Sequence, residues 1–299
     1  MRKKIVVAGV TGNIGSRLAS RLVELGHQVT GLGRNEARFK QMGLAGVDFR
    51  EGELTDVSLL TALLKEADAA FLLIPPNATA PDNLAYQNAT GEAIVQAVRD
   101  SGIRYVVNLS SQGADLEAGT GPVLGVHRQE LRLNQVPGLN VLHLRPAYFM
   151  ENLLANVPLV QRMGITGSAM RGDLSFPMIA TADIAGAAAG IFDRLDFRGV
   201  VIRDLLGPRD YSMQETAQIL GQAIGKPDLP YVQFSYEDGK QGMQQAGLSA
   251  SMAELYTEMS RGANEQGIFN RVSRTPENTT PTALEQFTAA VKGAFVAVA

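Results

Sequence analysis

The sequence predicts an α/β fold in which a doubly wound parallel sheet is followed by a smaller, mostly helical lobe. Strand-like and helix-like segments alternate with short connections up to Pro146, which is the pattern of a parallel sheet with helices on both faces. After Pro146 the alternation gives way to loops and helices. We therefore expect a first domain over residues 1–150 and a second lobe over residues 151–299, partly interleaved with the first.

The elements of the first half follow one another regularly. The β-branched run KIVVAG, residues 4–9, reads as a strand that is buried on both faces. The next segment places Ile14, Leu18 and Leu22 at helical spacing and ends at Gly26. Further strands are predicted at residues 27–34, 46–52, 67–76, 103–111 and 139–146, and helices between them at 35–43, 56–66, 83–101 and about 124–136.

The second half is less regular. A loop-rich stretch after Pro146 leads to a small-residue helix, a strand and a further helix that begins at the good capping residue Ser212. Thr282 and Glu285 have the spacing of a capping box and predict the start of the last helix. These later elements span residues 181–193, 199–207, 212–225, 236–262 and 281–297.

The composition excludes several kinds of site and partner. The chain has 299 residues and no cysteine, which excludes disulfides, thiolate nucleophiles and cysteine-ligated metals, and its three histidines lie too far apart in sequence to suggest a metal site. A net charge of -3 gives no basic footprint for nucleic acid. No segment approaches the ~20 apolar residues that span a bilayer, and the basic start reads as a strand rather than a signal peptide. We expect a soluble, cytoplasmic protein, with no membrane contact.

A glycine-rich loop joins the first strand to the first helix. In GVTGNIG, the three residues Gly9, Gly12 and Gly15 allow a tight turn, a close approach of the backbone to phosphate, and close packing of helix on strand. The start of the helix offers free amides and a positive dipole end to a pyrophosphate. An ordinary strand–helix turn is the alternative, but the strand before and the amphipathic helix after favour dinucleotide binding.

The end of the second strand indicates which dinucleotide is bound. NAD-selective sites place a carboxylate there, whereas this chain has Arg34 and no acidic residue until Glu36. Arg34, helped by Arg38, suits the 2′-phosphate of NADP(H) through charge-assisted hydrogen bonds. The alternative is that Arg34 only caps a solvated loop. The sequence favours NADP(H) over NAD(H).

Several segments together resemble the NmrA-like branch of the atypical short-chain dehydrogenases/reductases, over nearly the whole chain. They are GVTGNIG, GRNEARF, GELTD, LRPAYFMENLL, YEDGKQGMQQAGL and SRTPENTTPTALEQF. The family includes quinone reductases, azo-dye and triphenylmethane-dye reductases, and catalytically inert NADP-sensing regulators. The resemblance implies a Rossmann-like domain with a small C-terminal substrate lobe.

The resemblance also implies a set of site residues. The phosphate loop would be Gly9, Thr11, Gly12, Asn13, Ile14 and Gly15, with Arg34 at the 2′-phosphate and Glu53 and Leu54 beside the adenine. The family usually has aspartate where this chain has Glu53, which weakens that contact. Ile74, Pro75, Pro76, Ser110, Pro146 and Phe149 would lie near the nicotinamide half, and Ser111, Tyr148 and Phe149 near the electron acceptor.

The helix after the fifth strand lacks the usual tyrosine and lysine of short-chain dehydrogenases. By the resemblance, Val123 stands at the tyrosine position and His127 at the lysine position. Valine cannot give a proton to a ketone oxygen, so losing this acid should be costly for ketone reduction. Quinones and cationic dyes accept hydride without such an acid. We interpret His127 as a catalytic residue that holds the nicotinamide ribose, with proton donation as the alternative.

These expectations leave other interpretations open. In the alternative interpretation, His127 is an ordinary histidine whose hydrogen bonds are satisfied within the protein. The serines at 110–111 would then form only a turn, and residues 148–150 would only fill the core between the lobes. The first functional hypothesis is an NADPH-dependent reductase of a quinone, azo compound or similar small-molecule electron acceptor. The second is an NADP(H)-sensing regulator that binds a protein partner. The sequence does not decide between a monomer and a homodimer.

Overall fold

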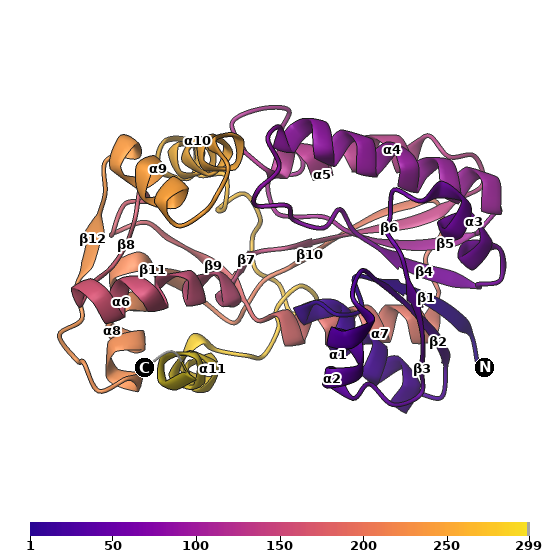
Figure 1. Cartoon of the computed structure of the whole chain (residues 1–299), viewed down its shortest axis with the longest axis horizontal. Helices are drawn as coiled ribbons and strands as arrows, with labels where there is room; N and C mark the ends of the chain where they lie inside the picture. The colour runs from indigo at the N-terminus through magenta and orange to yellow at the C-terminus, as the bar shows by residue number, and fades with distance from the viewer. Residues whose placement is uncertain (298–299) are drawn as a thin grey trace.

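The computed structural model describes residues 1–297 and consists of two lobes (Figure 1). The larger lobe contains a seven-stranded parallel sheet with the order β10-β6-β5-β4-β1-β2-β3. Its strands are β1 (Lys4–Ala8), β2 (Gln28–Gly33), β3 (Val47–Glu51), β4 (Ala69–Leu72), β5 (Tyr105–Leu109), β6 (Asn140–Pro146) and β10 (Val200–Leu205).

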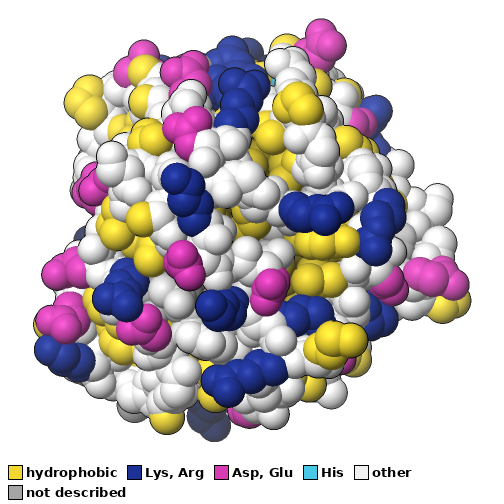
Figure 2. All heavy atoms as spheres, turned by 90° about the vertical axis from the view of Figure 1, so that its right-hand side faces the viewer, with side chains coloured by type: hydrophobic (Ala, Val, Ile, Leu, Met, Phe, Trp, Pro, Cys, Tyr) yellow, Lys and Arg dark blue, Asp and Glu magenta, His cyan; other side chains and the backbone are white. Residues whose placement is uncertain are grey.

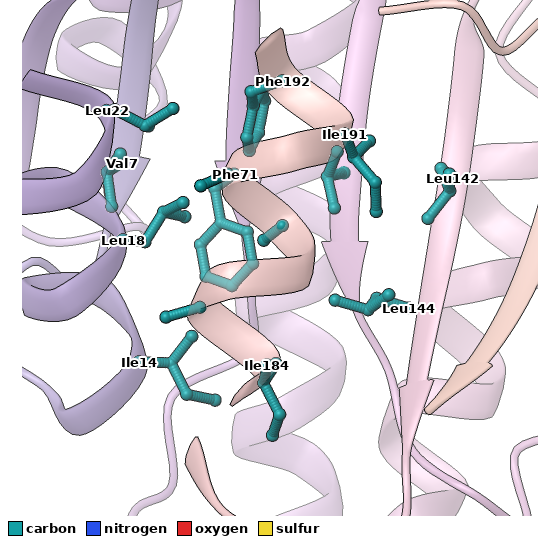
Figure 3. Packing of buried hydrophobic residues seen from close by; sticks show 14 of the residues in the cluster. Val7, Ile14, Leu18, Leu22, Phe71, Leu142, Leu144, Ile184, Ile191 and Phe192 are labelled. Carbon is teal, nitrogen blue, oxygen red and sulfur yellow. The ribbon is translucent and has the colours of Figure 1, made fainter. Parts of the chain in front are cut away.

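Helices cover both faces of this sheet because its strands are hydrophobic on both sides. Val7 packs into a core under α1 (Asn13–Glu24) and α7 (Thr181–Arg194), as Figure 3 shows, whereas the adjacent Val6 packs into a second core on the opposite face. The helices that contribute to this second core are α3 (Val57–Lys65), α4 (Asn83–Ser101) and α5 (Val123–Asn134). α2 (Glu36–Met42) packs through Phe39 beside β3 on the first face. Alternation along each strand therefore builds two cores.

The smaller lobe has its own core and two short sheets. The first sheet consists of β7 (Tyr148–Phe149), β9 (Ser175–Ile179) and β11 (Asp210–Ser212). The second sheet consists of β8 (Thr166–Ser168) and β12 (Tyr231–Gln233). Phe176 on β9 and Tyr211 on β11 are fully buried in the core of this lobe. The helical elements are η1 (Met150–Asn156), α6 (Val157–Met163), α8 (Met213–Ala223), α9 (Tyr236–Gln245), α10 (Ala250–Gln266) and α11 (Leu284–Ala297).

The structure confirms the predicted fold class and corrects parts of the second half. The segment after Pro146 is not loop-rich: β7, η1, α6 and β8 follow one another with short connections. Pro158 lies in the first turn of α6, a position where its missing amide costs no helical hydrogen bond, so it begins that helix. The strand predicted at 67–76 is also shorter, because β4 ends at Leu72.

A helix begins close to both predicted starts, but only the first is capped as predicted. Ser212 caps α8 as predicted, because its hydroxyl accepts a hydrogen bond from the amide of Glu215 at 3.1 Å. The capping box at Thr282 is wrong. The Thr282 hydroxyl instead donates to the carboxylate of Asp183, a stronger acceptor that α7 brings beside it, at 2.7 Å. One residue later, Gln286 accepts from the amide of Ala283 at 2.9 Å.

Candidate active site

The candidate site lies at the carboxyl ends of the parallel strands, the edge that faces the smaller lobe in Figure 1. Ligands of open α/β sheets bind at this edge, because helix starts and strand-to-helix loops converge there. Most of the predicted residues lie in the loops or helix starts that follow β1 to β5. Pro146 ends β6, Tyr148 and Phe149 form β7, and His127 lies in the second turn of α5.

The glycine loop after β1 has the geometry that its spacing predicts. Gly9 adopts a φ of +64°, which favours glycine, and its carbonyl accepts the amide of Gly12 at 2.9 Å. A side chain on Gly15 would collide with the Gly9 carbonyl, so helix and strand pack backbone to backbone. Within residues 1–297 no side chain caps the start of α1, while Gly12 and Asn13 are exposed. The first turn therefore offers its amides to an anion.

The side chains of Arg34, Glu53 and Tyr86 influence one another beyond the ends of β2 and β3. Arg34 is exposed directly after β2, and among the described residues it forms no ion pair within 4.0 Å. Burial raises the pKa of Tyr86 on α4, the guanidinium of Arg34 opposes this shift, and the carboxylate of Glu53 adds to it. Leu54 is buried in the core on the α3, α4 and α5 face of the sheet. Tyr86 belongs to this cluster although no local motif marks it in the sequence.

The loop after β4 is attached to the smaller lobe. Ile74 is buried, Pro75 half-buried and Pro76 exposed, so the chain turns outward along these residues. The carbonyl of Ala78 then accepts the amide of Ser249 at 2.8 Å, immediately before α10. The segment that the resemblance places beside the nicotinamide ribose therefore leads into a contact between the lobes.

Ser110 directly follows β5 and belongs to a buried polar network. Its hydroxyl donates to the carboxylate of Glu130 on α5, which also binds the guanidinium of Arg145 through two hydrogen bonds of 2.9 and 2.6 Å. Hydrogen bonding to Glu130 raises the pKa of Arg145. The Ser110 hydroxyl is thus engaged within the protein, whereas the neighbouring Ser111 is half-buried; a role for either in binding stays a prediction.

His127 is held in one tautomer by the backbone. Its Nδ1 lies 2.8 Å from the carbonyl oxygen of Ala114. Because a carbonyl can only accept, Nδ1 carries the proton of the neutral ring and Nε2 carries the lone pair. Val123, one turn earlier, is buried. A neutral His127 can therefore accept a hydrogen bond at Nε2, and it can donate a proton there only as the imidazolium.

The segment after β6 carries the remaining predicted residues. Pro146 is buried, and its carbonyl accepts the amide of Gln112 at 3.0 Å. Tyr148 and Phe149 are half-buried and diverge: Phe149 packs against the core under α1 and α7, whereas Tyr148 packs into the core of the smaller lobe. Tyr148 thus stands at the boundary between the lobes.

A Tyr-x-x-x-Lys spacing does occur, but on another element. Tyr236 and Lys240 lie one turn apart on α9, in the smaller lobe. Lys240 pairs with Glu254 at 2.8 Å, and the Tyr236 hydroxyl accepts from Asn264 at 3.0 Å. These contacts hold α9 against α10. The pair is not on the helix after β5, where short-chain dehydrogenases have theirs.

The opposite edge of the sheet carries a different feature. A shallow hollow of about 460 Å³ there is lined by both basic and acidic residues, among them Arg2, Lys3, Glu66 and Asp68. Figure 2 shows this side of the molecule, with Lys and Arg spread among acidic and hydrophobic side chains. Lys3 donates to the carbonyl of Asp193 near the end of α7 at 2.6 Å. Cations here complement carbonyl ends of helices, so we assign no ligand site.

Comparisons with known proteins identify the family of this chain. The family model described as the NmrA-like family matches residues 1–289. The chain belongs to the NmrA-like family. This NmrA-like chain is 30% identical to the uncharacterized oxidoreductase YesF of Bacillus subtilis, over 96% of this chain and 94% of the relative. It is 27% identical to an NAD(P)H azoreductase of Xenophilus azovorans, over 85% of each chain.

A solved structure has the same fold as this NmrA-like chain. It is an NADPH-dependent quinone oxidoreductase of Escherichia coli complexed with NADPH, with a TM-score of 0.80 and 21% identity, over 96% of this chain and 99% of that one. Among the helices of residues 1–297, none is both long and apolar enough to cross a membrane. The same residues contain no cluster of three or more His, Asp or Glu side chains arranged for a metal.

Proposed function

We propose that this protein is an NADPH-dependent reductase that delivers hydride to a quinone, an azo compound or a similar electrophilic aromatic acceptor. The similar proteins named above include an NAD(P)H azoreductase and an NADPH-dependent quinone oxidoreductase, which supports the general activity. The preference for the phosphorylated cofactor rests on Arg34, which stands after β2 where an NAD-selective site has a carboxylate.

The residues of the carboxyl edge fit a dinucleotide. The uncapped start of α1 would bind the pyrophosphate, Arg34 the 2′-phosphate, and the segments after β4 and β6 would flank the nicotinamide half. When bound, NADPH supplies the hydride. In this proposal Nε2 of His127 accepts a hydrogen bond from a ribose hydroxyl and so fixes the orientation of the nucleotide.

The choice of acceptor rests on α5, where by the family resemblance Val123 and His127 stand at the positions of the tyrosine and lysine that serve ketone reduction. A neutral His127 has no proton on Nε2, because Nδ1–H is bound to Ala114. The side chains of α5 therefore favour acceptors whose reduction needs no acid in the transition state. Quinones and cationic dyes meet this condition.

Incubation of the pure protein with NADPH and a panel of quinones, azo dyes and triphenylmethane dyes tests the proposal. We expect acceptor-dependent loss of absorbance of the reduced nicotinamide, faster with NADPH than with NADH. Tight NADPH binding without oxidation by any acceptor would contradict the reductase and favour the nucleotide-sensing regulator.

A further inference from the structure

The loop that joins β5 to α5, residues 110–122, reaches from the larger lobe into the smaller one. Its start is bonded to the end of β6, because the amide of Gln112 donates to the carbonyl of Pro146 at 3.0 Å. Further along, the side chain of Leu116 packs against the core of the smaller lobe. The chain then returns to the larger lobe, where α5 begins at Val123. We call these residues the β5–α5 loop.

Helix α10 of the smaller lobe holds the second half of the β5–α5 loop. Glu258, near the middle of the helix, accepts a hydrogen bond from the amide of Gly119 at 2.9 Å. A side chain on Gly262 would collide with the carbonyl of Gly119. A side chain on Gly121 would likewise collide with the carbonyl of Leu255. Helix and loop therefore touch backbone to backbone, and the Glu258 carboxylate fastens the loop at this contact.

The first half of the loop carries the hydrogen-bond partner of His127. Nδ1 of His127 lies 2.8 Å from the carbonyl oxygen of Ala114, a residue that is only 1% exposed. The next residue, Asp115, pairs at 2.8 Å with Arg271, which follows α10 in the smaller lobe. The carbonyl that sets the tautomer of His127 is therefore followed directly by a segment that the smaller lobe fastens at Asp115 and again at Gly119.

Glu258 is the stronger of these two attachments. Its hydrogen bond with the backbone is charge-assisted, and both Glu258 and Gly119 are half-buried. The side chains of Asp115 and Arg271 are 38% and 43% exposed, so water and salt screen their attraction. Without the Glu258 carboxylate the amide of Gly119 loses its acceptor, and the loop is free to relax away from α10.

We propose that Glu258 is a positioning residue for His127. Through Gly119 it keeps the β5–α5 loop, and with it the carbonyl of Ala114, in the place that holds the proton on Nδ1 and leaves the lone pair on Nε2. The partner of one ring nitrogen decides which nitrogen of a neutral histidine carries the proton. The smaller lobe thereby sets the tautomer of a side chain in the larger lobe. The use of Nε2 in binding rests on the proposed function, whereas the coupling itself needs no nucleotide.

The test replaces Glu258 by residues of similar length that differ in what they can accept. Glu258→Gln keeps an oxygen for the amide of Gly119, whereas Glu258→Met and the shorter Glu258→Ala have no strong acceptor. Glu254→Ala is the matched control, because Glu254 lies one turn earlier on α10 and pairs with Lys240 on α9 at 2.8 Å. Nitrogen NMR of labelled imidazoles in mildly alkaline solution reports which ring nitrogen is protonated, and His127→Ala assigns the signals.

Glu258→Met and Glu258→Ala should move the Nε2 signal of His127 from that of an unprotonated nitrogen toward that of a protonated one. Their NADPH affinity should fall roughly 2- to 30-fold, the range for residues that influence a site without touching its ligand. Single-turnover hydride transfer should slow for every acceptor alike. Glu258→Gln should keep the wild-type tautomer, and Glu254→Ala should match wild type in all three measurements.

The outcomes separate this inference from the proposed function. A protonated Nε2 in wild type, an unchanged Nε2 signal in a folded Glu258→Met or Glu258→Ala protein, or an equal change in Glu254→Ala would overturn the role of Glu258. A loss of thermal stability with the wild-type tautomer would show a merely structural residue. If wild type oxidises NADPH with no acceptor while Glu258→Met still shifts the His127 signal, the reductase proposal fails and the positioning role stands.

Discussion

Glu130 and Arg145 form a bidentate ion pair between α5 and the carboxyl end of β6, with side chains only 5% and 12% exposed. Breaking a buried pair leaves an uncompensated charge, so Glu130→Ala should lower the free energy of unfolding by about 3–5 kcal/mol. Glu92→Ala removes the solvent-exposed partner of Arg132 and should cost less than about 1 kcal/mol. Urea unfolding of both variants measures the difference, and similar losses would contradict the assigned burial.

His143 should make the protein less stable in mild acid. Burial lowers its pKa from 6.5 to about 4, and the ring is bonded to Asn108 and Asn134 on either side. Between these pH values the unfolded chain binds a proton that the folded protein does not. The contribution of His143 to stability is therefore complete above pH 6.5 and is lost as the pH falls toward 4, by up to about 3 kcal/mol.

His143→Gln removes this titration. The variant should be less stable than wild type at neutral pH, because its hydrogen bonds are altered, but should lose less stability on acidification. Unfolding free energies of both proteins at neutral pH and in mild acid give the comparison. An identical acid-induced loss in the two proteins would show that His143 titrates normally.

Arg34→Ala should weaken NADPH binding and leave NADH binding nearly unchanged. A lost hydrogen bond to a charged group costs ~1.5–3 kcal/mol, or roughly 10- to 150-fold in affinity. Lys40→Ala is the control, because Lys40 is an exposed cation nearby on α2 and already pairs with Glu36. Equal losses of affinity for both nucleotides would contradict the assignment of Arg34 to the 2′-phosphate.

Two glycines of the phosphate loop should fail in different ways. Gly12 has an ordinary extended backbone, so Gly12→Val should fold but lose nucleotide binding, since its side chain stands where the pyrophosphate approaches. Gly15→Ala collides with the Gly9 carbonyl and should lower stability by about 1–3 kcal/mol. Thermal unfolding and nucleotide titration distinguish them. A folded Gly12→Val protein with normal affinity would make the loop only a structural turn.

His127 is tested by two substitutions that differ in one contact. Asn retains a side-chain N–H that can replace Nδ1–H toward Ala114 but has no counterpart of Nε2, whereas Ala removes both. If His127 orients the nucleotide through Nε2, both variants should weaken NADPH binding and slow every acceptor alike in single-turnover hydride transfer. A slower hydride transfer to quinones alone would instead show that His127 donates a proton. An unchanged rate and affinity in both variants would show that His127 has no role in binding or catalysis.

The sequence predicted the sheet well because its signals are local. Gly9, Gly12 and Gly15 reveal the loop by spacing alone, and each strand of the large sheet is a short apolar run between breakers. Glu130 has no such signal: in HRQEL it resembles a solvated charge on a helix, and only the packing of α5 against β6 brings it to Ser110 and Arg145.

The smaller lobe was harder to predict for a related reason. Its strands have two to five residues, too few to show a period, and Thr282 binds a carboxylate that is distant in sequence rather than its own helix. The contact of Glu258 on α10 with the amide of Gly119, a residue far away in the sequence, likewise depends on packing that no local pattern encodes.

The position of α7 and β10 in the large sheet has a consequence for synthesis of the chain. Both elements come after residue 150, yet β10 pairs with the edge of β6 and α7 covers the face shown in Figure 3. While the ribosome is still making residues 181–205, the emerging sheet has an unpaired edge at β6 and an uncovered apolar face. Such surfaces attract other nascent chains. The growing polypeptide is therefore most exposed to aggregation just before its sheet is complete.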